Sequence, residues 1–136
     1  MVRVRSRNQT QNDDEADGLF ENLATASKPN SIASDAYRSL RTNLFYSVVD
    51  APPKVVPVTS PGSAEGKSIT CANVGIVLAH AGNETLILDG DLRKPTLQRI
   101  FGICNPNGLV NVILGEQSLP AVWKEPLFGL KVVAAG

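Results

Sequence analysis

The feature that most constrains this chain is a Gly-Lys-Ser tripeptide that ends at Ser68 and stands between two apolar segments. The apolar run before it, residues 55–58, predicts a buried strand. A loop rich in small residues follows at residues 60–66, and the apolar segment at residues 68–81 predicts a largely buried helix. Strand, tight loop, Gly-Lys-Ser and helix are the layout of a nucleotide phosphate-binding loop.

The residue types in this loop suit phosphate chemistry. Small residues let backbone N–H groups close around phosphate oxygens, and a helix N-terminus adds partial positive charge behind them. Lys67 would reach the β- and γ-phosphates, and the Ser68 hydroxyl would ligate Mg²⁺. Pro61 stands where the general pattern has its first glycine, and Gly62 can supply the flexible joint instead. The alternative is a chance Gly-Lys-Ser at a turn before a helix.

A second motif follows the next apolar run, residues 85–88, which predicts a strand of a parallel sheet covered on both faces. The run ends in Asp89-Gly90-Asp91. Two carboxylates at the carboxyl end of a parallel strand can hold Mg²⁺ or take a proton from an attacking hydroxyl. The alternative is a polar turn in which Asp91 caps a helix. The phosphate loop favours the functional interpretation.

The remaining elements are predicted from their periodicity. A helix over residues 32–48, capped by Asn30 or Ser31, carries an apolar stripe. The members of that stripe are Ile32, Ala36, Leu40, Leu44 and Val48. Short helices are expected over residues 95–101, 109–114 and 119–123, and a strand over residues 130–133. Pro57 conflicts with the strand predicted at residues 55–58, because proline removes a ladder hydrogen bond.

Composition limits the function classes. The 136 residues suffice for one small domain, and 13 basic against 13 acidic residues give no indication of a nucleic-acid partner. Cys71, Cys104 and His80 do not form a metal-binding pattern. The chain has no apolar run long enough to span a membrane and no signal peptide. Residues 1–29 are expected to form a disordered tail, and residues 30–136 the domain. Within the tail, residues 18–26, with Leu19, Phe20 and Leu23, could make a short helical turn or dock on the domain.

Four motifs stand in one order along the chain. They are Ser-Asp-Ala-Tyr-Arg-Ser-Leu-Arg-Thr-Asn (34–43), Val-Thr-Ser-Pro-Gly-Ser-Ala-Glu-Gly-Lys-Ser (58–68), Leu-Ile-Leu-Asp-Gly-Asp-Leu-Arg-Lys-Pro (86–95) and Gly-Leu-Val-Asn-Val-Ile-Leu-Gly (108–115). Together they resemble the bacterial tyrosine kinases of capsule and exopolysaccharide biosynthesis, and the resemblance covers residues 30–136. It implies an α/β fold, a P-loop NTPase with a Rossmann-like, three-layer parallel sheet.

The resemblance also implies ligands and residue roles. ATP and Mg²⁺ are the implied cofactors, and residues 61–68 match the Walker A loop. The implied nucleotide-binding residues are Gly62, Ser63, Ala64, Glu65, Gly66, Lys67, Ser68 and Ile69. Lys67, Asp89 and Asp91 would be catalytic, with Asp89 as base or metal partner for the tyrosine hydroxyl. Ser68, Asp89 and Asp91 would hold the metal.

Partners and location follow from the same resemblance. Asp35, Arg38 and Arg41 match the family's Glu-x-x-Arg-x-x-Arg helix, which mediates ring-like self-association. The family works with a membrane-embedded activator of the polysaccharide co-polymerase type. This implies a cytoplasmic protein held peripherally at the inner face of the membrane, an autokinase that tunes polymer length, and no nucleic-acid partner.

This chain departs from the family pattern at several positions. Asp35 replaces the usual glutamate, Ala64 replaces a glycine and would be strained in a left-handed conformation, and Ile69 replaces a threonine. The chain is also expected to be truncated before the Walker B strand and the tyrosine cluster. We therefore expect little kinase activity from this chain alone, and a gap, a bare sheet edge or a substitute strand beside residues 54–59.

Two other functions stay open on the sequence alone. The chain could be a P-loop ATPase of the partition or division-site type, although those proteins carry a second lysine where this chain has Gly62. It could also be a non-catalytic oligomerisation or regulatory fragment, which the missing Walker B strand favours. Phosphorylation of tyrosine from labelled ATP would support the kinase, and hydrolysis of ATP without it would support the ATPase. If neither reaction occurs, the non-catalytic fragment is supported.

Overall fold

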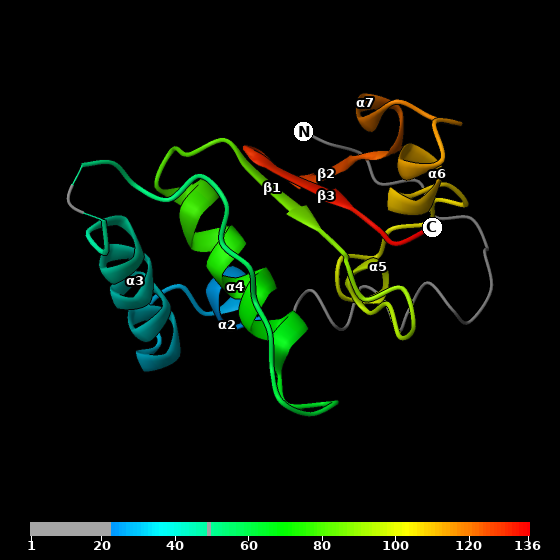
Figure 1. The fold of residues 1–136 in the computed structure, drawn as a ribbon. Helices are drawn as coiled ribbons and strands as arrows, with labels where there is room; N and C mark the ends of the chain where they lie inside the picture. The colour runs from blue at the N-terminus through cyan, green and yellow to red at the C-terminus, as the bar shows by residue number, and fades with distance from the viewer. Residues whose placement is uncertain (1–22, 49) are drawn as a thin grey trace, which may run out of the picture.

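The computed structural model describes residues 23–48 and 50–136, in which one long helix lies across a small sheet (Figure 1). Residues 1–22, most of the predicted tail, lie outside the described residues. The elements in chain order are α2 (Ala24–Ser27), α3 (Ile32–Phe45), α4 (Lys67–His80), β1 (Thr85–Leu88), α5 (Leu97–Ile100), α6 (Leu109–Ile113), α7 (Leu119–Val122), β2 (Lys124–Leu127) and β3 (Leu130–Val133).

The described sheet has the order β1-β3-β2. β1 and β3 run parallel, with Thr85 opposite Leu130 and Leu88 opposite Val133, which confirms both predicted strands. β2 pairs antiparallel with β3 through a tight connection, so the sheet is mixed rather than all parallel. β2 was not predicted because its sequence, Lys-Glu-Pro-Leu, lacks both an apolar run and β-branched residues.

Helix α4 confirms the predicted helix and packs on one face of the sheet. Gly75 makes the close approach possible, since a Cβ there would lie 2.5 Å from Ile87 Cδ1 and 3.3 Å from Leu130 Cδ1. The core around this contact is apolar and includes residues from α2, α4, α5 and the sheet. Its buried members are Leu23, Ala72, Ile76, Ala79, Ile87, Leu97, Ile100, Phe101, Leu130 and Val132.

The strand predicted at residues 55–58 is wrong. This segment is irregular in the structure and Val55 is 83% exposed. Pro57 removes a donor within the run, and the described strands leave the segment without a ladder partner. The expected bare edge is instead found on β1, which is the terminal strand of the described sheet.

The predicted three-layer arrangement is also not found around β1. Ile87 is buried against α4, whereas Leu86 and Leu88 on the opposite face are 39% and 46% exposed. The prediction took a continuous apolar run as the mark of a strand covered on both faces. In the described residues only the α4 side of β1 is covered.

Helix α3 begins as predicted, with Ser31 Oγ accepting a hydrogen bond from the Ser34 amide, and ends three residues earlier than expected. The prediction for its apolar stripe is wrong, because Ile32 is 90% exposed and Leu40 is also exposed. Ser34 is the buried residue of this helix. Its hydroxyl lies within hydrogen-bond distance of the Ala24 and Lys28 carbonyl oxygens and can donate to either. The buried side of α3 is therefore rotated away from the stripe that periodicity predicted.

The segment that precedes α3 packs on the domain. Leu23 is almost fully buried and α2 contacts both α3 and α4, which confirms the docking expected of residues 18–26 for its described part, residues 23–26. A polar contact anchors α2 to α4. Asn73 Oδ1 accepts from Thr25 N at 3.0 Å and from Thr25 Oγ1 at 2.7 Å, while Asn73 Nδ2 donates to the Ile69 carbonyl at 2.9 Å.

The short helices α5, α6 and α7 lie within the ranges predicted for them, each slightly shorter than expected. α6 follows Gly108, which packs closely against the backbone of the segment after β3. Leu109 N donates a hydrogen bond to the Ala134 carbonyl in that segment at 2.8 Å. Among the residues that the structure describes, none of the helices combines the length and the apolar character needed to cross a lipid bilayer.

Candidate functional site

The predicted phosphate loop is an exposed turn that leads directly into α4. Gly66, the N-cap of α4, has φ 85°, and Ala64 has φ 60°. The strain expected at Ala64 is therefore present, because a side chain with a Cβ is disfavoured in this left-handed region. The loop also folds on itself, since Gly62 N donates to Glu65 Oε2 at 3.0 Å. One of the loop amides is thus already hydrogen-bonded to a carboxylate of the loop itself.

Lys67 and Asp91, which the sequence analysis selected separately, form an ion pair. Lys67 Nζ lies 3.0 Å from Asp91 Oδ2, and both side chains are about one-third exposed. The hydrogen bond from Lys67, followed by one from the Lys94 amide, lowers the pKa of the Asp91 carboxyl below its usual value. Asp91 is thus ionised at neutral pH and holds Lys67 at the first turn of α4.

Asp89 organises the loop between β1 and α5. Its carboxylate is buried, with 4% of the residue exposed. Oδ1 accepts from Asp91 N at 3.2 Å, and Oδ2 accepts from Thr96 N and Leu97 N, each at 3.1 Å. The helix-capping role weighed for Asp91 therefore belongs to Asp89, while Asp91 Oδ1 accepts from Lys94 N within the loop.

Thr96 joins the two halves of the site, and the sequence analysis did not select it. Its Oγ1 donates to Ser68 Oγ at 2.6 Å, and its amide is one of the donors to Asp89. The residue precedes a short helix, where threonine usually serves as a cap, so the sequence carries no signal for a contact with Ser68. Ser68, Thr96, Asp89, Lys67 and Asp91 form one connected polar cluster.

The cluster offers oxygen donors rather than nitrogen or sulfur. In the described part of the chain there is no group of three or more His, Cys, Asp or Glu side chains placed to hold a metal ion. Two carboxylates and a serine hydroxyl are nevertheless the donor types that Mg²⁺ accepts when phosphate oxygens and water complete its shell. The donor set fits Mg²⁺ held jointly with a phosphate ligand and does not fit a site built from protein alone.

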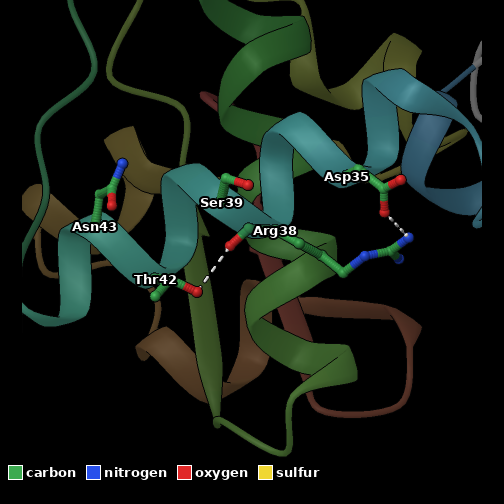
Figure 2. A pocket seen from close by; sticks show the side chains of 5 residues that line it. All are labelled: Asp35, Arg38, Ser39, Thr42 and Asn43. Atoms are coloured by element: carbon green, nitrogen blue, oxygen red, sulfur yellow. Dashed lines mark hydrogen bonds and ion pairs between the residues drawn. The ribbon is translucent and has the colours of Figure 1, made fainter.

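Ile69 lies just inside α4 with its side chain partly exposed, beside the loop. Of the predicted loop residues, the structure brings Lys67 and Ser68 together with both aspartates. It does not bring the predicted association residues to this cluster. Asp35 and Arg38 lie on α3, where their side chains form an ion pair of 2.7 Å beside a shallow groove (Figure 2). Arg41 Nη1 donates to the Val77 carbonyl of α4 at 3.3 Å.

Comparisons with known proteins show what the chain is similar to. No family model matches the chain. CapB of Staphylococcus aureus is 41% identical over 110 residues, which cover 80% of this chain and 48% of CapB. YwqD of Bacillus subtilis, a tyrosine-protein kinase, is 41% identical over 101 residues, which cover 74% of this chain and 43% of YwqD. The chain is similar to parts of bacterial tyrosine kinases.

A solved structure agrees with this similarity in fold. The chimerical protein CapA2B2 superposes with a TM-score of 0.71 at 32% identity, over 84% of this chain and 50% of that one. The chain spans about half the length of the relatives that it matches.

Proposed function

We propose that this chain carries the ATP-binding part of a protein-tyrosine autokinase that regulates capsular or exopolysaccharide polymerisation and export. The observation that best supports the proposal is the connected cluster at the start of α4. It unites the lysine and serine of the Gly-Lys-Ser tripeptide with both carboxylates that follow β1.

The residues of the loop would bind the phosphates. Backbone N–H groups of residues 62–68 supply donors, and Lys67 supplies the charge that the β- and γ-phosphates need. In the structure Lys67 is paired with Asp91, and Gly62 N with Glu65. A phosphate would therefore replace two internal carboxylates. Once Lys67 has turned to the phosphate, Asp91 is free to serve as a metal ligand.

Mg²⁺, when bound, neutralises phosphate charge during transfer to a tyrosine hydroxyl. Ser68, Asp89 and Asp91 are the residues we propose to hold it. The geometry supports a direct role more for Asp91, because Asp89 is engaged by three backbone donors. The proton-acceptor role proposed for Asp89 requires one of these donors to give way to the tyrosine hydroxyl.

The ATP-binding role is tested by calorimetric titration of MgATP into the purified chain. Lys67→Met should abolish measurable binding, because several phosphate contacts share that charge. The matched control is Lys131→Met, since Lys131 pairs with Glu84 at 2.8 Å on a separate surface. Unchanged affinity in Lys67→Met would overturn the assignment.

Labelled ATP distinguishes the kinase from the alternatives. Transfer to tyrosine supports the kinase, hydrolysis without transfer supports an ATPase of the partition type, and binding without either supports a regulatory fragment. The similarity of the chain to bacterial tyrosine kinases favours the first.

The partner proposals concern α3. We propose self-association through Asp35, Arg38 and Arg41, regulated by a membrane-embedded activator of the co-polymerase type that holds the protein at the inner face of the membrane. The exposed Asp35–Arg38 pair supports a role at an interface. Arg41 contacts α4, so in this proposal it links the interface to the helix that carries Lys67.

A further inference from the structure

Thr96 occupies the position of a helix cap without acting as one. It is the N-cap of α5, yet its side chain makes no capping hydrogen bond in that helix as the structure describes it. Asp89 Oδ2 takes that role by accepting from Thr96 N and Leu97 N. The Thr96 hydroxyl is instead directed to Ser68 Oγ, 28 residues earlier in the chain and 2.6 Å away. Because Asp89 caps α5, the contact between the Thr96 hydroxyl and Ser68 needs an explanation other than helix capping.

The backbone around Thr96 holds the hydroxyl in place. The Thr96 carbonyl accepts from Arg99 N at 3.1 Å and from Ile100 N at 3.0 Å, so the residue is bonded on both sides. Leu97 and Ile100, which follow it, are buried in the core. The hydroxyl is therefore presented to Ser68 from a fixed support, whereas Ser68 alone could rotate about its χ1 angle.

We propose that Thr96 is a positioning residue that fixes the Ser68 hydroxyl for Mg²⁺ bound with the nucleotide. The inference rests on the proposed function and adds to it a residue that joins Ser68 to Asp89. Either hydroxyl can donate in this pair, because each carries one proton and two lone pairs. Fixing the Ser68 rotamer keeps a lone pair available to the metal and removes the entropy cost of ordering it on binding.

The test measures how much Mg²⁺ improves the affinity for ADP. Calorimetric titrations of ADP are run with MgCl₂ and with EDTA on the parent chain, Thr96→Val, Thr96→Ser and Ser68→Ala. Thr96→Val keeps the shape and removes the hydroxyl, and Thr96→Ser keeps the hydroxyl. Thermal unfolding followed by circular dichroism shows whether each variant is folded.

Thr96→Val should reduce the Mg²⁺-dependent gain by roughly 3- to 10-fold, the usual effect of losing one hydrogen bond. Affinity in EDTA should be unchanged, and Thr96→Ser should restore the gain to within about twofold of the parent. A role in folding alone would lower affinity equally in both buffers.

The outcomes separate this inference from the proposed function. If Ser68→Ala loses the gain and Thr96→Val keeps it, the inference is wrong and the proposed function stands. Equal losses for Thr96→Val in both buffers also overturn the inference. If the folded parent binds no ADP, or Ser68→Ala leaves the gain intact, the proposed metal role of Ser68 fails and the inference fails with it.

Discussion

Lys67 donates a hydrogen bond of 3.0 Å to Asp91, a residue 24 positions further along the chain. The pair connects the first residue of α4 with the loop that follows β1. The same lysine would serve a phosphate, so the carboxylate competes with the ligand for it. Because of this competition, removing the Asp91 charge should change the affinity of the site for a phosphate ligand.

Asp91→Asn should increase the affinity for ADP in the absence of Mg²⁺. Removing the charge that competes with phosphate for Lys67 should raise the affinity by roughly 1.5- to 5-fold, since the pair is partly exposed. With Mg²⁺ present the same variant should bind less tightly, because a proposed metal ligand is lost. Calorimetry in both buffers measures the two effects. Glu84→Gln, which breaks the pair with Lys131 elsewhere, should change neither.

The ion pair also predicts how stability depends on pH. The pKa of Asp91 is lowered from the ordinary 3.8, so its contribution to stability is present above that value. The contribution is lost as pH falls through the lowered pKa, because the unfolded chain takes up a proton on this carboxyl more readily than the folded protein does. Urea unfolding of the parent and Asp91→Asn should differ at about pH 6 and converge in stronger acid. A difference that persists at the acid end would contradict the assignment.

Ala64→Gly should stabilise the protein. Ala64 has φ 60°, a conformation that costs an L-residue about 1–2 kcal/mol, and glycine loses about 0.5–1 kcal/mol through its extra freedom when unfolded. The net gain should be up to about 1 kcal/mol by urea unfolding. Ala81→Gly is the matched control, since Ala81 has φ −83° and no strain to relieve. A gain of equal size at both positions would refute the explanation.

Gly75→Ala should destabilise the protein by about 1–3 kcal/mol, the usual cost of overpacking a core. The added methyl would lie 2.5 Å from Ile87 Cδ1. Ile87→Val removes that atom and alone costs about 0.5–1.5 kcal/mol. The double variant should be more stable than the sum of the two single effects predicts. Strict additivity in urea unfolding would mean that the two residues do not meet as described.

Arg38→Ala combined with Asp35→Ala should weaken self-association, because both side chains lie exposed on α3 as an ion pair (Figure 2). Exposed pairs contribute only about 0.2–1 kcal/mol each, so assembly should be weak and should decline with added salt. Light scattering over a concentration series measures it. Thr42→Ala on the same helix is the control, and equal scattering by the double variant and the control would rule out this surface.

Much of the fold followed from local sequence signals. The α4 helix and the strands at Thr85–Leu88 and Leu130–Val133 were predicted because each is a continuous apolar segment between turn residues. The same signal failed at residues 55–58, where an apolar run needs a neighbouring strand to pair with. The periodicity of apolar residues failed on α3, because the polar contacts of Ser34 and Arg41 determine which side of that helix packs against α2 and α4.

The site was predictable in its residue types and less so in its connections. Lys67, Ser68, Asp89 and Asp91 were selected from their spacing after apolar segments, and the structure brings them together. The path of the loop after β1 turns Asp89 toward backbone amides and Asp91 toward Lys67. No periodicity encodes that path. Thr96 escaped notice because its contact with Ser68 arises only when β1 and α4 are packed side by side.

Helix α2 has four residues, too few to be stable as an isolated helix in water. The Thr25 amide and hydroxyl both bond to Asn73, 48 residues away. We therefore expect α2 to be stable only while the first turns of α4 are formed and Asn73 is in place. Hydrogen exchange at the Thr25 amide then reports the opening of α4 near the Ile69 carbonyl, to which Asn73 also donates. One amide at the start of the described chain thus serves as a probe of the helix that carries Lys67.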